Sequence, residues 1–173
     1  MKFTENLAQN KKVILEKWFD LIIDSYPSDS SNFLRNETNR FQNPVGYTIS
    51  SDLERLFEAI VGKSDYDRLS ECFENIVKIR TVQDFTPSQA VAFVLQLKNV
   101  VREVSGESFR ERDALDEMLA FEAKVDWACL VCFDTYMKCK EKIFQLQADE
   151  AKLRVYKLLE RTNLIDRKAE HGE

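Results

Sequence analysis

Residues 107–164 read ESFRERDALDEMLAFEAKVDWACLVCFDTYMKCKEKIFQLQADEAKLRVYKLLERTNL, a stretch with neither glycine nor proline. Most of its interior positions hold strong helix formers such as Leu, Ala, Glu, Lys and Gln. We therefore expect one continuous helix, which would span about 85 Å at about 1.5 Å per residue. A domain of this size cannot cover such a helix along its whole length, so we expect its two halves to have different surroundings.

The first half of this stretch carries apolar residues on more than one helical face. One line consists of Met118, Phe121, Val125, Cys129, Cys132, Tyr136, Cys139, Ile143 and Leu146. A second line consists of Leu119, Ala123, Trp127, Leu130 and Phe133. Because a surface helix has a single apolar stripe, two lines predict that this half is buried in a core.

After Leu146 the apolar pattern narrows to a seam with alternating spacings of three and four. The seam consists of Ala148, Ala151, Val155, Leu158, Thr162 and Ile165. A narrow seam favours pairing with another helix, and about three heptads are the minimum for a coiled coil. We predict that Ala151, Val155, Leu158 and Ile165 contact a partner protein or a second copy of the chain. The alternative is that the seam packs back on its own molecule.

The composition indicates a soluble, ordered, all-α protein. Of its 173 residues, 44% are apolar and 32% are charged, and only four are glycine and three proline. So few turn residues disfavour a sheet protein, and we expect a bundle of six or seven helices. A net charge of −5 argues against nucleic-acid binding, which depends on Lys and Arg. No apolar run approaches the ~20 residues of a membrane-spanning helix and the N-terminus lacks a signal-peptide core, so we expect a cytoplasmic protein without membrane insertion.

Caps and breakers divide the chain before residue 107 into helices. Residues 40–49, RFQNPVGYTI, combine Asn-Pro, a glycine and two aromatics, and predict a surface loop. Ser51 and Glu54 form a capping-box pattern, which predicts a helix that begins there and ends at Gly62. The segment Thr86-Pro87-Ser88-Gln89 is a second capping box, with proline at the first helical position.

Three blocks of sequence carry a resemblance to a known family. They are ILEKWF (14–19) leading to NPVG (43–46), IRTVQDFTPSQA (79–90) and YMKCKEKI (136–143). Over residues 7–165, with the blocks in the same order and spacing, the chain resembles the RsbRD-type N-terminal domain. This family is named for the RsbT co-antagonist proteins of bacterial stress signalling.

The resemblance implies a cytoplasmic sensory or regulatory module with a globin-like helical fold that holds no haem. Its last helix is expected to project as a connector, because members of the family often precede a phosphorylatable STAS domain or a kinase. Since only a few residues follow Ile165, we expect a separate partner to receive the signal, either a kinase, a STAS-domain protein or another regulator. We expect residues 1–145 to form the sensor domain, and residues 146–173 to form a helical extension with a charged tail.

A sensor with a ligand, metal or redox site in the helical core is the alternative. Cys129, Cys132 and Cys139 could form a redox switch or hold zinc or an iron–sulfur cluster. Small residues that pack a core stripe are the simpler interpretation, so we assign no metal and no cofactor. The only histidine, His171, lies in the charged tail and disfavours a histidine-ligated haem. No nucleophile, base and orienting group can be assembled, so we expect no enzyme.

Two further groups of residues allow both a functional and a structural interpretation. Polar groups gather at one helix junction, where they form either an anion site or a cap with an ion pair: Arg80, Gln83, Asp84 and Thr86. The cap is favoured, because Thr86 already occupies part of the position that an anion would take. Aromatic residues either line a small-molecule cavity or fill the core: Trp18, Phe41, Tyr47 and Trp127.

Overall fold

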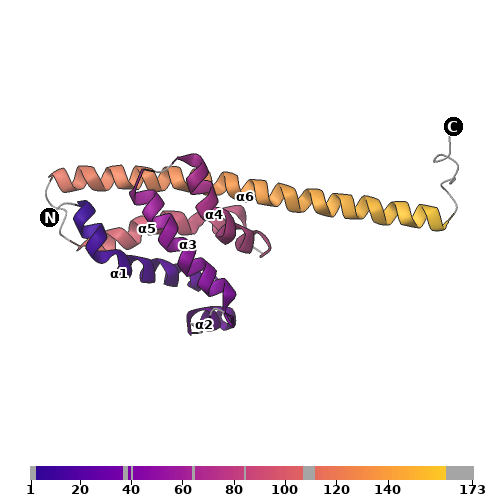
Figure 1. Ribbon diagram of the computed structural model, residues 1–173, viewed down its shortest axis with the longest axis horizontal. Coiled ribbons are helices and arrows are strands. Elements are labelled where there is room, and N and C mark those ends of the chain that lie inside the picture. The colour runs from indigo at the N-terminus through magenta and orange to yellow at the C-terminus, as the bar shows by residue number, and fades with distance from the viewer. Residues whose placement is uncertain are drawn as a thin grey trace. The chain divides into compact units, whose positions relative to one another are not determined.

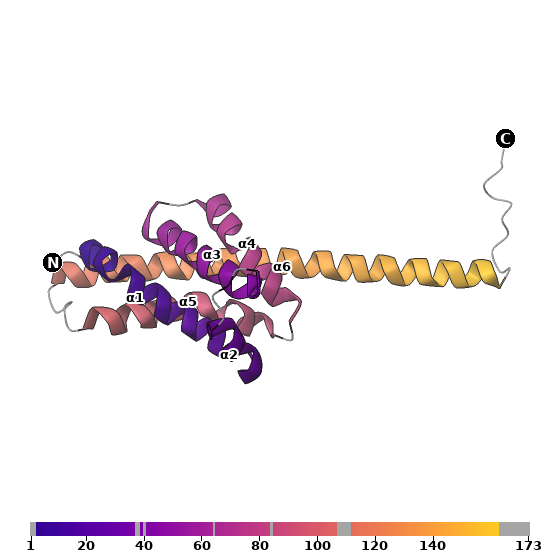
Figure 2. The ribbon, with the colours of Figure 1, turned by 60° about the horizontal axis from the view of Figure 1, so that its bottom comes forward.

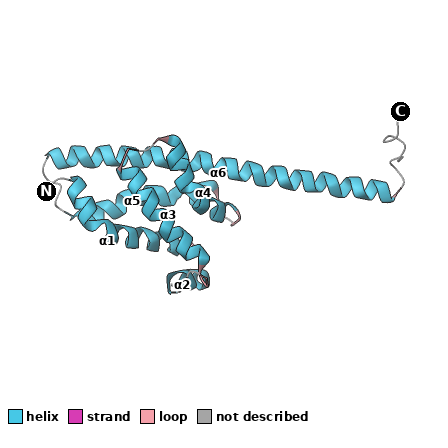
Figure 3. Cartoon of the chain, viewed as in Figure 1, coloured by secondary structure: helices cyan, strands magenta, loops and turns pink. Residues whose placement is uncertain are grey.

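The computed structural model describes residues 3–36, 39, 41–63, 65–83, 85–106 and 112–162, with side chains from Ala114 onward in the last range. These residues form six helices and no strand, so the protein is all-α, as predicted (Figure 1, Figure 3). The helices are α1 (Phe3–Asp24), α2 (Ser28–Asn36), α3 (Pro44–Val61), α4 (Tyr66–Thr81), α5 (Pro87–Ser105) and α6 (Arg112–Arg161). None of the helices among these residues is long and apolar enough to cross a membrane. The globin-like arrangement stays a prediction.

The long glycine-free and proline-free stretch forms a single helix, α6, of 50 residues. Its predicted beginning near Glu107 lies outside the described residues, as do Ile165 and His171. The chain divides into two compact units, Met1–Met137 and Lys138–Glu173, and α6 contributes residues to both. Which part acts as a sensor and which as an extension is a separate question, so the functional division after residue 145 stays a prediction.

In the first unit, α1 packs mainly on α5, and α3 packs mainly on α4 (Figure 2). Trp18 of α1 is completely buried, and its indole N–H donates a hydrogen bond of 2.7 Å to the backbone oxygen of Phe93 in α5. A buried indole therefore keeps a partner for its only polar group. The ring of Phe93 also meets the ring of Phe73 in α4 edge-on, with centroids 6.3 Å apart. These contacts make one core from helices that are distant in sequence.

Aromatic and ionic contacts hold the first part of α6 to α1 and α5. The ring of Phe121 lies 5.5 Å from the ring of Phe3, centroid to centroid. Arg102 of α5 donates two hydrogen bonds to the carboxylate of Glu122, at 2.6 and 2.7 Å. Such a two-point contact between a guanidinium and a carboxylate fixes orientation as well as distance. Phe121 and Glu122 therefore place one face of α6 on the core.

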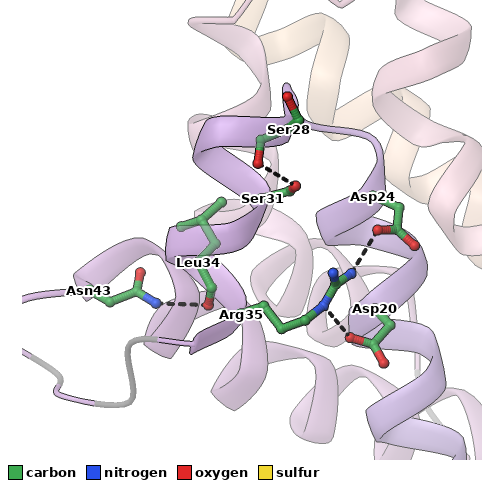
Figure 4. A network of polar contacts seen from close by, with 7 residues as sticks. All are labelled: Asp20, Asp24, Ser28, Ser31, Leu34, Arg35 and Asn43. Carbon is green, nitrogen blue, oxygen red and sulfur yellow. Dashed lines mark hydrogen bonds and ion pairs between the residues drawn. The ribbon is translucent and has the colours of Figure 1, made fainter.

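The helix that was predicted to begin near Ser51 begins at Pro44 instead, so the predicted loop over residues 40–49 is wrong from Pro44 onward. The cap is Asn43, whose side-chain oxygen accepts a hydrogen bond of 2.8 Å from the N–H of Gly46. Its amide group donates to the backbone oxygen of Leu34 in α2, at 2.9 Å (Figure 4). Proline at the first helical position fits this start, because its missing N–H would have no partner there. The capping-box pattern at Ser51 therefore lies inside the helix.

Gly46 is required at this helix start by the closeness of its own cap. A Cβ atom on residue 46 would come within 2.8 Å of Cγ of Asn43. Real Cβ atoms do not approach other heavy atoms so closely, so a larger residue would displace the capping side chain. On the other side of α2, Arg35 pairs with Asp20 and Asp24 of α1, at 3.0 and 2.7 Å (Figure 4). The short helix α2 is thus joined to α1 by ion pairs and to α3 by the cap.

The prediction that both apolar lines of α6 are buried is only partly correct, because the first line is buried in its middle but ends at Leu146, which is 61% accessible to solvent. The buried apolar side chains of α6 in the first unit are Ala114, Phe121, Val125, Ala128, Val131, Cys132 and Tyr136. The second line is exposed, with Leu130 66% accessible to solvent. Helical spacing shows that a face is apolar, but a face covered by the same molecule and one open to another molecule have the same spacing. The sequence therefore predicts that this face of α6 is apolar, but not whether the same molecule covers it.

Candidate functional site

The predicted seam in the second unit consists of solvent-exposed side chains. Ala151, Val155 and Leu158 are all exposed, and the two larger ones are each more than half accessible. At 3.6 residues per turn these three lie within about 60° of one another around the helix. The fourth predicted contact, Ile165, lies outside the described residues. The described part of the seam therefore forms one open apolar face.

A second set of apolar side chains lies on the opposite side of the same helical segment. Leu146 and Leu153 are exposed and are seven residues apart, so they lie almost above one another. On a regular helix they point roughly 160° or more away from Val155. The segment is therefore apolar on two sides, whereas the sequence spacing predicts only the seam as a contact and assigns Leu146 to the buried line of the first half.

Polar side chains between these two faces stabilise the helix without covering either face. Arg154 pairs with Glu150 at 2.6 Å, one turn away. Gln145 donates to the carboxylate of Asp149 at 2.9 Å, and Lys152 lies 3.7 Å from the same carboxylate. Pairs three or four residues apart each stabilise an exposed helix by about 0.2–0.5 kcal/mol. Because these pairs satisfy the charged groups locally, the apolar faces remain open to another molecule.

The exposed apolar line of α6 in the first unit is a further candidate surface. It consists of Leu115, Leu119, Trp127, Leu130 and Phe133. One charged residue falls in the middle of this line on a helical projection: Asp126, which is exposed and pairs with Lys98 at 2.5 Å. An acidic residue among apolar ones was the signal that this line is not core. Contiguous exposed apolar side chains of this kind mark interaction surfaces more often than isolated ones do.

The three candidate redox or metal cysteines lie in two different environments. Cys132 is completely buried, whereas Cys129 and Cys139 are half-buried. Burial raises the pKa of Cys132 well above its usual value, and burial also raises the pKa of Cys129. Because the thiolate is the metal ligand and the nucleophile, these shifts disfavour both uses. In the part of the chain that the structure describes, no three His, Cys, Asp or Glu side chains are grouped to hold a metal ion.

The predicted capping box at Thr86 is confirmed. The hydroxyl of Thr86 accepts from the N–H of Gln89 at 3.3 Å, and the N–H of Thr86 donates to the side-chain oxygen of Gln89 at 3.0 Å. Pro87 occupies the first helical position of α5. The cap therefore uses the groups that an anion at this helix start would need. The other predicted member of the junction, Asp84, lies outside the described residues.

Arg80 lies under this junction and not at the cap. It is only 1% exposed, and its Nε donates to the backbone oxygen of Ala90 at 2.9 Å. Nη2 donates to the backbone oxygen of Gln89 at 3.1 Å, and Nη1 and Nη2 lie 3.2 and 3.3 Å from the hydroxyl oxygen of Ser25. No carboxylate among the described residues pairs with it. A buried cation without a counter-ion is costly, and burial lowers the pKa of Arg80.

Aromatic rings take part in holding the Arg80 charge. Its Cζ lies 4.2 Å from the ring centroid of Phe85, 5.5 Å from that of Phe93 and 5.6 Å from that of Tyr26. The negative face of an aromatic ring attracts a cation at such distances. Three rings and three oxygen acceptors therefore replace part of the water that the guanidinium loses.

The four aromatic residues that were considered for one cavity do not come together. Trp18 is completely buried, whereas Phe41 is almost fully exposed. Tyr47 and Trp127 are each partly exposed on different helices, α3 and α6. Trp18 therefore fills the core, whereas the other three are exposed to solvent and line no common cavity among those of the described residues.

The family model described as the RsbT co-antagonist protein rsbRD N-terminal domain matches residues 12–151. This match covers most of the chain, so the chain belongs to the RsbRD N-terminal domain family, a family of regulatory signalling domains that is not a known family of enzymes. The chain is also similar to an uncharacterized protein of Archaeoglobus fulgidus, with 23% identity over 146 residues, which cover 82% of this chain and 84% of that protein. No solved structure matches the chain.

Proposed function

We propose that this chain is a non-enzymatic, cytoplasmic sensor module of bacterial stress signalling, which acts by binding another protein through the C-terminal part of α6. The observation that carries the proposal is the exposure of large apolar side chains in the second unit: Phe144, Leu146, Leu153, Val155, Tyr156 and Leu158. So many exposed apolar side chains on one helical segment favour contact with another molecule, because the contact removes their apolar surface from water. The family also consists of regulatory domains, which act on other proteins.

The spacing of the exposed residues fits a helical partner. Val155 and Leu158 belong to the seam with spacings of three and four, which matches the side-chain spacing of a facing helix. Leu146 and Leu153, on the opposite side, provide a second line of contact. A helix with two apolar faces fits a bundle of more than two helices, or a groove that encloses it. The partner is either a second copy of the chain, which would make a homodimer or a larger oligomer, or a kinase, a STAS-domain protein or another regulator.

The test is a double substitution in the seam, Val155→Glu with Leu158→Glu, compared with the single substitution Lys152→Glu. Both variants make the net charge more negative by two units, but only the first places charge on the seam. We expect the double variant to lose self-association, measured as mass in solution, and to lose partners that the unchanged chain captures from the extract of its native host. A chain truncated after Leu146 should give the same losses.

Lys152→Glu is the control. Lys152 is exposed and lies between the two apolar faces, so this variant should keep the mass and the partners of the unchanged chain. If the double variant also keeps them, the seam is not the contact surface. Equal circular dichroism spectra would show that the helix itself is intact in both variants.

Ligand sensing is the second candidate function, and one observation favours it. The buried guanidinium of Arg80 has no carboxylate partner among the described residues, and it lies next to a cavity. The thiol version of sensing has less support, because the pKa of Cys132 and that of Cys129 are raised. Absorbance above ~320 nm in anaerobically purified protein would instead favour thiolate ligation of a metal or cluster.

A further inference from the structure

A cavity of about 680 Å³ lies in the first unit, at the junction of α1, α2, α4 and α5. It is lined by Ser25, Tyr26, Pro27, Ser30, Val82, Gln83, Phe85 and Gln89. A second hollow of about 460 Å³ shares Tyr26, Ser30 and Gln83 with it. Small-molecule sites in proteins usually have volumes of about 300–1,000 Å³ and combine apolar walls with a few polar groups. This cavity meets both conditions.

Two buried polar atoms in the cavity wall have no hydrogen-bond partner: the hydroxyl oxygen of Tyr26 and the side-chain oxygen of Gln83. Tyr26 is only 8% exposed, and its ring is fixed edge-on against the ring of Phe85, with centroids 5.7 Å apart. Its hydroxyl oxygen lies near enough to the Arg80 guanidinium to favour the charged form as a weak acceptor, but it does not reach regular hydrogen-bond geometry, and its O–H has no acceptor. Buried polar groups are nearly always paired, so two orphans in one wall point to a missing partner.

The buried guanidinium of Arg80 contacts several of the residues that line this cavity. Ser25 and Gln89 accept hydrogen bonds from its guanidinium, and Tyr26 and Phe85 face it, so four of the lining residues contact it. Nη1 and Nη2 both donate to the one hydroxyl oxygen of Ser25, at 3.2 and 3.3 Å. That hydroxyl itself donates to the backbone oxygen of Ile22 at 2.5 Å. Two donors that share one oxygen form a fork, and the two oxygens of a carboxylate fit such a fork better.

We propose that this cavity binds a small organic acid with a single carboxylate and an apolar body. The carboxylate accepts a hydrogen bond from Tyr26 and takes the place of the Ser25 hydroxyl on the Arg80 fork, after one rotation of the Ser25 side chain. The body of the ligand lies against Phe85, Val82 and Pro27. The amide of Gln83 can turn to present either its oxygen or its N–H groups, so it adapts to the ligand.

A single negative charge fits the site better than a phosphate dianion. The lining residues include no Lys and no Arg, and Arg80 is the one guanidinium that contacts them among the described residues. One cation balances one carboxylate, whereas a dianion would leave a net buried charge. The inference goes beyond the proposed partner contact, because it concerns the first unit and is measured by ligand binding.

The test uses the full chain with sodium benzoate as the probe and benzamide as its uncharged counterpart. Benzoate should bind, measured by titration calorimetry at constant ionic strength, and should raise the melting temperature, whereas benzamide should do neither. Tyr26→Phe removes only the hydroxyl and should weaken benzoate binding by at least about tenfold, since a hydrogen bond to a charged group is lost. Tyr156→Phe, in the second unit, should leave the affinity unchanged.

Ser25→Ala distinguishes a ligand-binding role of Arg80 from a purely structural one. Without the competing hydroxyl the Arg80 fork is free, so the variant should bind benzoate at least as tightly as the unchanged chain, even if it melts at a lower temperature. If Arg80 only joins helices, Ser25→Ala will lower the melting temperature and benzoate will have no effect on either protein. That outcome would overturn the proposal.

Three other outcomes would also overturn it. Equal binding of benzamide would show that the carboxylate is not recognised. Binding of inorganic phosphate without binding of benzoate would assign the site to another class of anion. Benzoate binding that appears only after Asp84→Asn would show that Asp84, which lies outside the described residues, already supplies the counter-ion of Arg80.

Discussion

Cys132 shows how the surroundings of one residue set its chemistry. It lies on the buried face of α6 in the first unit and is completely inaccessible to solvent. Burial raises the pKa of its thiol well above the usual value of 9.0, whereas the charge of Arg80 acts in the opposite direction with a smaller effect. A thiol that stays protonated at neutral pH reacts slowly and packs as a small apolar group.

The buried thiol predicts a loss of stability at alkaline pH. Below pH 9 both the folded and the unfolded chain keep the proton; as the pH rises through the unfolded value near 9.0, only the unfolded chain loses it. For one thiol this favours unfolding by roughly 1.4 kcal/mol at pH 10. The decrease in melting temperature between pH 7 and pH 10 should therefore be smaller in Cys132→Ala than in the unchanged chain. Cys139→Ala, in the second unit, should keep the full decrease, and equal decreases in all three proteins would show that Cys132 does not contribute.

At the scale of elements, the two faces of α6 in the first unit allow a comparison within one helix. Phe121 is 4% exposed and Phe133 is 42% exposed, although both are phenylalanines on the same helix. Phe121→Ala should lower the free energy of unfolding by about 3–5 kcal/mol, as for other buried aromatic residues. Phe133→Ala should lower it by less than about 1 kcal/mol, because little apolar area leaves a core.

Chemical unfolding of both variants at low protein concentration measures this difference. Low concentration matters, because self-association would add to the apparent stability. A large loss from Phe133→Ala under these conditions would mean that the exposed line is covered by the same molecule. The variant Lys142→Ala, at an exposed position of the second unit, controls for the substitution itself.

Local signals predicted some helix boundaries correctly and failed where two signals competed. The cap at Thr86 is complete within four residues, so the sequence contains all that determines it. For α3 the pattern at Asn43-Pro44 competes with the one at Ser51, and both satisfy the same local rule. The backbone oxygen of Leu34, which accepts from Asn43, favours the first. That contact joins two helices, and local sequence patterns do not include it.

The candidate sites were predictable to different degrees for the same reason. The seam around Val155 follows from spacing alone, and its described residues are exposed. Arg80 was placed at the correct junction, but its acceptors, Ser25 and Ala90, come from two other helices. The cavity beside it depends on Tyr26, which no local sequence pattern indicates as a site residue. The surroundings of the Tyr26 hydroxyl are determined by the packing of several helices, which local sequence patterns do not include.

At the scale of the whole molecule, the two units differ in what stabilises them. The first unit has a core that draws on several helices, including the buried residues Trp18, Phe73 and Phe93. The described part of the second unit is helix α6 alone, with exposed apolar side chains and ion pairs between neighbouring turns. Most of the stability of helices in proteins comes from packing of an apolar face, and the described part of the second unit contains no other element to pack on. The second unit should therefore be much less stable than the first unless another molecule packs on it.

This difference predicts a concentration effect in hydrogen exchange. If the seam is a contact surface, the backbone amides of residues 147–161 should exchange more slowly as the protein concentration rises, because association removes the open states of the helix. Residues 14–23, in the core of the first unit, should exchange equally slowly at every concentration. In the Val155→Glu and Leu158→Glu double variant, residues 147–161 should exchange fast throughout, while 14–23 stays protected. Slow exchange of 147–161 that is the same at all concentrations and in the double variant would mean that the helix is stabilised without a partner, which would contradict the proposed function and leave the carboxylate site unaffected.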